Sequence, residues 1–125
     1  MVATDVCVPI SRLAECVTQT QRDIEESRIL APIVGHVGDG NFHLTLLIDM
    51  DDNDELRRAK ALSERLVERA LAMDGTCTGE HGVGQGKMKY LAAEHGVAAL
   101  AVMASIKRAL DPQNIMNPGK IITLS

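Results

Sequence analysis

Apolar residues recur with a period of two in the middle of the chain, which is the pattern of a strand with one apolar face. Every second residue from Phe42 to Ile48 is apolar, so this stretch is predicted to be a strand. A second strand is predicted from Pro32 to His36, and Asp39-Gly40 between the two is a strong signal for a two-residue hairpin turn. Shorter strands are predicted over residues 6–9 and 76–79.

Elsewhere a period of three to four residues replaces the alternation and predicts helices. The first predicted helix begins at Ser11, a favourable N-cap residue, and runs to about residue 29. The second follows the acidic stretch 49–54, whose charges suit a helix N-terminus, and stops at Gly75. The remaining predicted elements are a glycine-rich loop over 82–86, helices over 88–94 and 97–110 that Gly96 separates, and a turned tail over 117–120.

The order of these elements is β-α-β-β-α-β, followed by further helices. This is the ferredoxin-like order, in which an antiparallel sheet carries its helices on one face. The sequence therefore predicts an α+β fold, and its 125 residues are long enough for a single domain with a buried core over 1–125. We expect the sheet edges to pair with further strands of a larger parent domain.

The predicted hairpin carries a histidine on each strand, and this is the most specific chemical feature of the sequence. If Asp39 and Gly40 form the turn, His36 lies directly opposite His43. Residues paired in this way have their Cβ atoms roughly 4.5–5.5 Å apart on one face. Two imidazoles held there can chelate one metal ion, although each could instead satisfy a local hydrogen bond. Asp39 could be a further ligand, but its place in the turn is the preferred interpretation.

A carboxylate and an imidazole stand side by side at Glu80-His81, flanked by glycines. Neighbours on an extended backbone point to opposite faces. One of the two can therefore complete a site of two imidazoles and a carboxylate, while the other faces an adjoining pocket. That division suits a metal ion that polarises a substrate oxygen beside a base that removes its proton. The alternative is a glycine-rich connector with two solvated polar residues.

Composition narrows the range of functions. Only 2% of the residues are aromatic, the net charge is −4 and the basic residues are scattered, so the sequence argues against nucleic-acid binding. No apolar run approaches the length of a membrane span. Three widely spaced cysteines without a CxxC pair indicate buried thiols in a reducing compartment. We expect a cytoplasmic protein, with a peripheral position at the inner membrane as a further possibility.

The other motifs favour structural roles. The stretch from Gly82 to Lys87 fits neither common phosphate-binding pattern, because its glycines fall at alternate positions. It is interpreted as flexible backbone that passes close to a bound group. His95 stands before Gly96 at a predicted helix end, where an imidazole interacts favourably with the helix dipole.

Three segments together resemble the C-terminal, substrate-cap part of FAD-linked oxidases of the vanillyl-alcohol-oxidase type. The group that they resemble most is that of the D-lactate, glycolate and D-2-hydroxyglutarate dehydrogenases. The resemblance runs from about Asp5 to Ile122. Its most specific segments are GHVGDGNFH at 35–43, GTCTGEHGVG at 75–84 and LDPQNIMNPGK at 110–120.

The resemblance implies a parent enzyme in which a small 2-hydroxy acid is oxidised to a 2-oxo acid and its hydride passes to FAD. A separate N-terminal domain would hold the FAD, and a downstream acceptor would take the electrons. By motif position, His36, His43 and Glu80 match the ligands of a divalent metal, zinc or manganese. His81 matches the base that takes the substrate hydroxyl proton, and Asn117 lies in the tail segment that runs near the flavin.

The sequence also departs from that family. It lacks the FAD-binding domain, and Thr45 stands where relatives often have an asparagine that contacts flavin or substrate. Residues 1–4 include none of the basic residues that grip the substrate carboxylate in relatives. We therefore expect the isolated chain to be inactive. The alternative is a non-catalytic ferredoxin-like module for binding or oligomerisation, a homo-oligomer with a vestigial metal site.

Overall fold

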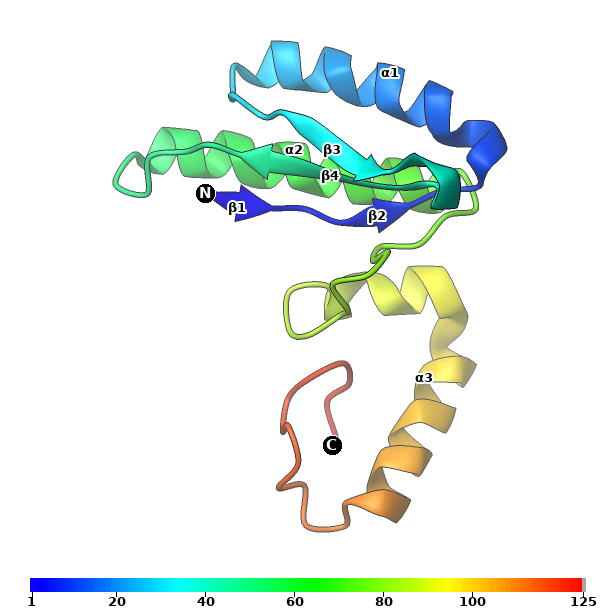
Figure 1. Ribbon diagram of the computed structural model, residues 1–125. Coiled ribbons are helices and arrows are strands. Elements are labelled where there is room, and N and C mark those ends of the chain that lie inside the picture. The colour runs from blue at the N-terminus through cyan, green and yellow to red at the C-terminus, as the bar shows by residue number, and fades with distance from the viewer. Residues whose placement is uncertain (125) are drawn as a thin grey trace. The chain divides into compact units, whose positions relative to one another are not determined.

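The computed structural model describes residues 1–124 of the chain (Figure 1). Two compact units are present, Met1–His81 and Gly82–Ser125. The first contains a small antiparallel sheet and two long helices, and the second contains one long helix and the C-terminal tail. The predicted α+β class is confirmed.

The sheet of the first unit is built around β4 (Asn41–Leu46), which pairs antiparallel with all three other strands. One edge of β4 pairs with two short strands that follow each other in the chain, and the opposite edge pairs with the strand before it. These are β1 (Val2–Ala3), β2 (Val6–Cys7) and β3 (Ile33–His36).

The β3–β4 hairpin is confirmed, but the predicted register is wrong by two residues. His36 pairs with Asn41, and His43 pairs with Val34. A 3₁₀ helix over Val37–Asp39 and a left-handed Gly40 (φ 77°) close the connection in place of a two-residue turn. The reason is tertiary: the Gly40 carbonyl accepts a hydrogen bond from Val8 N at 3.0 Å, and a Cβ on Gly40 would lie 2.0 Å from the Val8 carbonyl oxygen.

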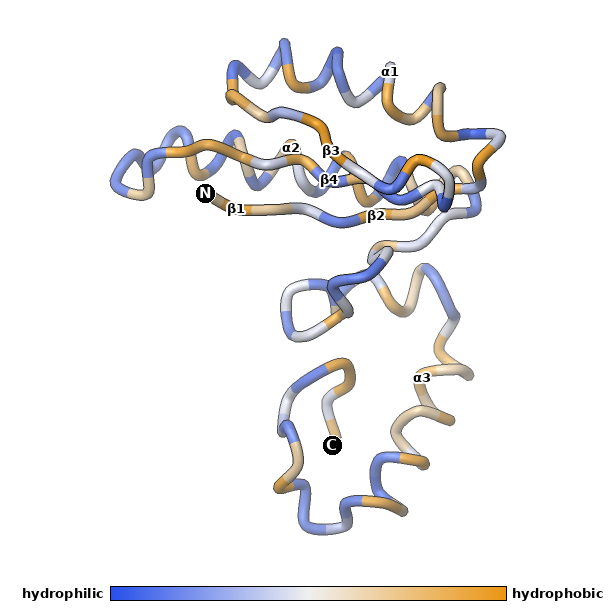
Figure 2. The backbone as a smooth tube through the Cα atoms, in the orientation of Figure 1, coloured by the Kyte–Doolittle hydropathy of each residue, from blue (hydrophilic) through white to orange (hydrophobic). Residues whose placement is uncertain are grey.

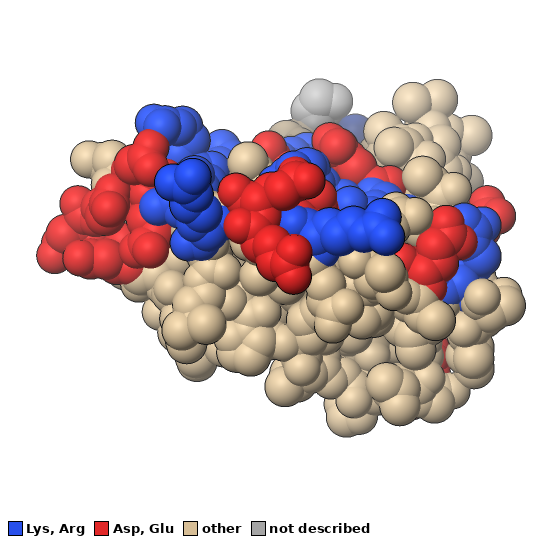
Figure 3. All heavy atoms as spheres, turned by 90° about the horizontal axis from the view of Figure 1, so that it is seen from above, with Lys and Arg blue, Asp and Glu red and all other residues tan. Residues whose placement is uncertain are grey.

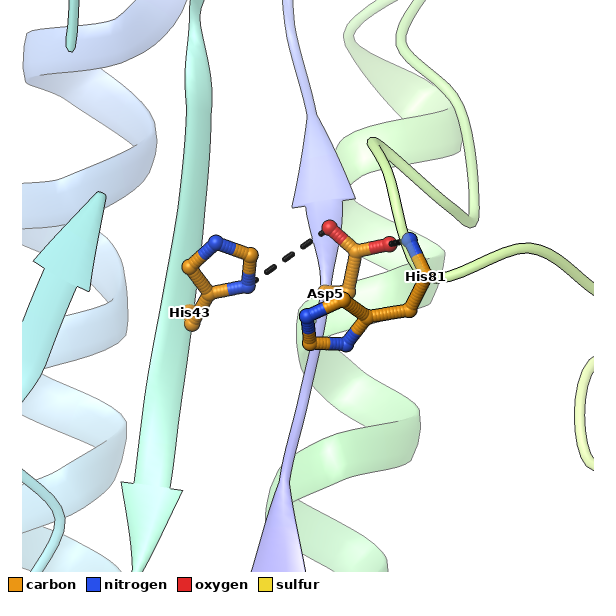
Figure 4. Close-up of side chains that lie close together, drawn as sticks. All are labelled: Asp5, His43 and His81. Atoms are coloured by element: carbon orange, nitrogen blue, oxygen red, sulfur yellow. Dashed lines mark hydrogen bonds and ion pairs between the residues drawn. The ribbon is translucent and has the colours of Figure 1, made fainter. Parts of the chain in front are cut away.

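Both histidines nevertheless remain on one face of the sheet, because side chains alternate with a period of two and the shift is two residues. On β4, Phe42, Leu44 and Leu46 are at most 2% exposed and form the core beneath the helices. His43 points to the other face. Figures 1 and 4 show the helix over 53–72 behind the strands, and in Figure 4 the His43 ring lies in front of the strands. The candidate site therefore lies on the sheet face that the helices leave open.

The two helices of the first unit are α1 (Ile10–Ser27) and α2 (Asn53–Ala72). Pro9, not the predicted Ser11, is the N-cap of α1, and its fixed φ makes it compatible with a helix start. Asp52 caps α2 by accepting hydrogen bonds from the amides of residues 54 and 55. Hydropathy changes from residue to residue along both helices in Figure 2, as expected when only one side of each faces the core.

The strand predicted over 76–79 is reduced to a single bridge between Thr76 and Cys7. After Thr76 the chain bends, and the Thr76 hydroxyl exchanges hydrogen bonds with the backbone of Thr78 (Oγ1 to O 3.1 Å, N to Oγ1 3.3 Å). The amides that follow point to the side chain of Asp5 rather than to a neighbouring strand.

The second unit begins with a glycine-rich loop and a 3₁₀ helix (Met88–Tyr90) and continues as α3 (Leu91–Leu110). Gly96 kinks α3, as predicted, by adopting φ 79° and ψ 159°. Asp111 follows α3, binds the Lys107 ammonium and accepts the amides of Ile115 (3.0 Å) and Met116 (2.9 Å). This network holds the first turn of the tail.

Charged side chains occupy the helix surfaces of the first unit. Figure 3 shows a band of mixed basic and acidic side chains with acidic ones gathered at one end, beside a broad region that carries almost no charged side chains. Several are paired, among them Arg58 with Asp54 at 2.8 Å and Arg65 with Asp23 at 3.4 Å. Of the helices described, none combines the length and apolar character needed to cross a membrane.

Candidate metal centre

The structure brings the three predicted metal ligands together. Glu80 Oε1 lies 3.0 Å from His43 Nε2 and 3.5 Å from His36 Nε2. The two imidazole rings are 6.3 Å apart between centroids and stand edge to face. One ligand atom from each residue lies within 4.8 Å of the other two, so a single cation could contact all three.

The hydrogen bond of His43 prepares this site for a cation. His43 Nδ1 lies 3.0 Å from the Thr4 carbonyl oxygen, and because a carbonyl only accepts, Nδ1 carries the proton. In the neutral ring Nε2 then has a lone pair, and that lone pair faces the Glu80 carboxylate, which is also an acceptor. Two facing acceptors need a positive charge between them, which a metal ion or a proton on Nε2 would supply. Metal-binding histidines commonly donate their other nitrogen to a carbonyl in this way, which fixes the ring orientation.

The site is open on one side. The His43 side chain is 10% exposed, whereas those of His36 and Glu80 are 62% and 47% exposed. A cation bound here would be anchored at the sheet and would keep coordination positions towards solvent. Catalytic metal sites keep open positions of this kind, whereas structural sites are closed by protein ligands.

A buried acceptor lies on the same sheet face. Asn41 is two residues before His43 on β4, and its Oδ1 atom is buried with no hydrogen-bond partner among the described residues. The orientation of its amide is fixed, because Nδ2 donates to Asp5 Oδ1 at 2.9 Å. An unpartnered buried oxygen is costly unless a water or ligand reaches it, so Asn41 Oδ1 is a further acceptor on the face that carries the histidines.

His81, the predicted base, lies against this cluster. Its ring stacks on that of His43 with centroids 4.8 Å apart and planes inclined by 14°. Its Nε2 is 4.0 Å from Glu80 Oε1, and its side chain is 47% exposed. The strand alternation used to separate Glu80 from His81 is wrong here, because the segment is a bend. Bend geometry, not alternation, places the imidazole beside the ligands.

Asp5 belongs to this site and was not recognised as a site residue from the sequence. It is 1% exposed, and Figure 4 shows it between His43 and His81. Burial alone would raise the pKa of Asp5, but hydrogen bonds from the His81 amide, Thr78, Asn41 and the Glu80 amide outweigh it and hold that pKa well below its usual range. Asp5 is therefore an anion inside the protein. The available signal was an acidic residue directly before the apolar run at 6–8.

A second cluster of possible ligands, formed by Asp5, His43 and His81, is less suited to a metal ion. Asp5 Oδ2 already accepts hydrogen bonds from Thr78 Oγ1 and from backbone amides, and Nδ1 of His43 is bound to the Thr4 carbonyl. The ligand set with His36 and Glu80 has no such competition among the hydrogen bonds described for its facing atoms.

Asn117, the predicted flavin contact, belongs to the second unit. It adopts a left-handed conformation (φ 48°) just before Pro118 and its side chain is exposed. Asparagine tolerates this conformation better than most residues. Its role towards a flavin remains a prediction.

The chain has relatives among known proteins. Residues 1–121 match the family model described as "FAD linked oxidases, C-terminal domain". Among curated relatives, the chain is 54% identical over 123 residues to the probable mitochondrial D-lactate dehydrogenase of Danio rerio, covering 98% of this chain and 25% of the relative.

Two further relatives extend the comparison. The mitochondrial D-lactate dehydrogenase [cytochrome] of Arabidopsis thaliana is 51% identical over 119 residues, covering 95% of this chain and 21% of the relative. The glycolate oxidase subunit GlcD of Bacillus subtilis is 38% identical over 117 residues, covering 94% and 25%. The chain thus spans about a quarter or less of the length of these relatives.

Proposed function

Because the chain belongs to the family of FAD-linked oxidase C-terminal domains, we propose that it supplies the metal site and the proton acceptor of an enzyme that oxidises a 2-hydroxy acid to a 2-oxo acid. The observation that carries this proposal is the position of Glu80 Oε1 between two imidazole nitrogens, 3.0 Å from His43 and 3.5 Å from His36. Names of relatives include both D-lactate dehydrogenase and glycolate oxidase, so the substrate class proposed is a small 2-hydroxy acid.

His36, His43 and Glu80 would hold a divalent cation, zinc or manganese, since neutral imidazole plus carboxylate suits both ions. When bound, such a cation would act as a Lewis acid that polarises a substrate oxygen. The hydrogen bond from His43 to the Thr4 carbonyl keeps one imidazole correctly turned. The exposed sides of His36 and Glu80 leave room for the substrate to approach.

His81 is the proposed base. Oxidation of a 2-hydroxy acid removes a proton from the hydroxyl oxygen and a hydride from the α-carbon, and it leaves a carbonyl group. The His81 ring can take the proton beside the ligands, where its Nε2 lies 4.0 Å from Glu80 Oε1. FAD, when held by the flavin-binding part of the enzyme, supplies the hydride acceptor, and a downstream acceptor then removes the electrons. Asn117 is the proposed contact to that flavin.

The compartment is part of the proposal too. Two of the relatives above carry "mitochondrial" in their names, whereas the cysteine content suggested a reducing compartment, met by the cytoplasm. We propose that the protein works in a reducing compartment. Localisation of a tagged protein distinguishes the cytoplasm from the mitochondrion.

Metal analysis tests the proposal directly. The purified chain, incubated with zinc or manganese and freed of excess metal, should retain about one ion per chain. His36→Ala should retain much less, and the double variant His43→Ala, Glu80→Ala should retain none. Equal metal content in the wild type and the double variant would contradict the proposal and favour the non-catalytic module. Circular dichroism of each variant controls for unfolding.

A further inference from the structure

The segment that carries Glu80 and His81 lies outside the helices and strands, and a buried carboxylate holds it instead. Asp5 Oδ2 accepts the amides of Gly79 at 2.8 Å, Glu80 at 3.0 Å and His81 at 2.8 Å. It also accepts the hydroxyl of Thr78 at 2.8 Å. Four successive residues are thus bound to one oxygen atom, 73 to 76 positions away in the sequence.

The other oxygen of the same carboxylate faces β4. Asp5 Oδ1 accepts from Asn41 Nδ2 at 2.9 Å and lies 3.6 Å from His43 Nδ1. The carbonyl of the preceding residue, Thr4, accepts a hydrogen bond from that imidazole. The Thr4 hydroxyl accepts a hydrogen bond from the Leu44 amide at 2.8 Å. Two adjacent residues therefore orient both sides of the candidate metal centre.

We propose that Asp5 is a positioning residue, which seats the Glu80–His81 segment against β4 and thereby sets the distance from Glu80 to His43. This inference rests on the proposed function, in which Glu80 binds a metal ion and His81 takes a proton. Asp5 itself contacts the ligands through their backbone or ring edge, not the reacting atoms.

The fit at Gly79 supports close seating. A Cβ on Gly79 would lie 1.6 Å from Asn41 Nδ2 and 2.8 Å from Asp5 Oδ1. Real Cβ atoms do not approach so closely, so the backbone passes over Asn41 and Asp5 at a distance that only glycine allows. The segment is therefore packed onto the carboxylate and is not a loosely attached loop.

A neutral amide cannot replace the carboxylate. An asparagine at position 5 has one acceptor oxygen and one donor nitrogen. If its oxygen faced the amides of residues 79–81, its nitrogen would face the donor Nδ1 of His43, which lies 3.6 Å from the present Asp5 Oδ1, even if Asn41 turned its own amide over to accept. If it were turned over, its nitrogen would face the amides instead. Either orientation leaves donors opposed in a buried site, which is costly.

Zinc affinity of the 125-residue chain tests the proposal, measured by competition with a fluorescent chelator. Asp5→Asn should bind zinc about 10- to 100-fold more weakly than the wild type, the range usual for loss of a group that orients a ligand. Asp23→Asn is the matched control, because Asp23 is also a buried carboxylate but binds Arg69 between α1 and α2. The control should keep the wild-type zinc affinity even if its melting temperature falls.

Amide hydrogen exchange of the metal-free wild type is an independent measurement. The amides of Gly79, Glu80 and His81 should be protected although they lie outside helices and strands, and Asp5→Asn should expose them. Exchange of all three at the rate of an unstructured chain in the wild type would overturn the proposal, even if Asp5→Asn fails to fold.

The two measurements separate this proposal from the proposed function. If the wild type binds zinc and Asp5→Asn binds it equally well, the positioning role is overturned and the metal site stands. If the wild type binds no zinc, but its amides at 79–81 are protected and those of Asp5→Asn are not, the positioning role is supported and the metal site fails.

Discussion

His81 lies close enough to the candidate ligands to act either as a base or as a further ligand, because its ring is stacked 4.8 Å from that of His43. We predict that it acts as the base. In a chimera in which this chain replaces the matching C-terminal segment of the Danio rerio relative, His81→Ala should lower D-lactate turnover by about 10²–10⁴-fold. Metal content should stay near that of the unmodified chimera. Dye reduction and elemental analysis measure the two quantities.

Two outcomes would contradict this assignment. Loss of metal together with activity would make His81 a ligand, and full turnover in the variant would remove it from the mechanism. His95→Ala is a matched control, since it removes an imidazole from α3 and should leave both quantities unchanged.

At the residue scale, the sequence was informative where chemistry depends on side-chain type. The hairpin signal predicted His36 and His43 as ligands, whereas the carboxylate–imidazole pair left open which of its two members completes the site. The family resemblance favoured Glu80, and the structure brings the three side chains together. Asp5 could not, because its contacts are mostly backbone amides from a segment more than 70 residues away. Backbone groups are the same for every residue type and leave no pattern in a sequence.

At the element scale, Asp111 organises the end of α3, and its protonation should loosen the turn that follows. The hydrogen bond from Lys107 lowers the pKa of Asp111, burial opposes this, and the amides of Met116 and Ile115 lower it further. A pKa that is lower in the folded state means that the carboxylate stabilises the turn above the unfolded value of about 3.9. That stabilisation is lost as pH falls through the folded value.

Amide NMR measures this directly. The Ile115 and Met116 signals should shift together with a midpoint below about pH 3.9. In Asp111→Asn the same signals should lose this titration and exchange faster at neutral pH. A midpoint above the unfolded value would show that the contacts to Lys107 and the amides do not favour the charged carboxylate.

The elements themselves were largely predictable, whereas their pairing was not. The hairpin, both long helices of the first unit and the break at Gly96 follow from local patterns. The register of the hairpin depends on Gly40 packing against Val8, which is a contact between distant parts of the chain. The expected strand after Gly75 was lost for the same reason, since Asp5 competes for its amides.

At the scale of the whole molecule, metal binding should stabilise one unit only. All three candidate ligands lie in Met1–His81. At a free metal concentration 100 times the dissociation constant, binding to the folded state alone adds about 2.7 kcal/mol to the free energy of unfolding. We predict a gain of this size for the first unit at pH 7.5, while the exchange rates of α3 amides stay unchanged.

The gain should shrink sharply at pH 5. An imidazole binds a metal ion only when it is deprotonated, and histidine typically changes charge between about pH 5 and 8. Hydrogen exchange with and without zinc or manganese at both pH values resolves the two units. Equal stabilisation at pH 5 and 7.5 would exclude histidine ligation. The boundary at Gly82 coincides with the alternating glycines, which predicted a loop but gave no sign of a boundary between units.

The two-residue period of β4 also limits which insertions and deletions the gene can tolerate. Losing one codon between those for Asn41 and Leu46 would reverse the faces of the residues beyond it, turning an imidazole towards α2 or a leucine into the metal centre. A change of two codons would preserve the faces, just as a register two residues away from the predicted one still leaves His36 and His43 together. Length variation that spares the chemistry is therefore expected in even steps within this strand.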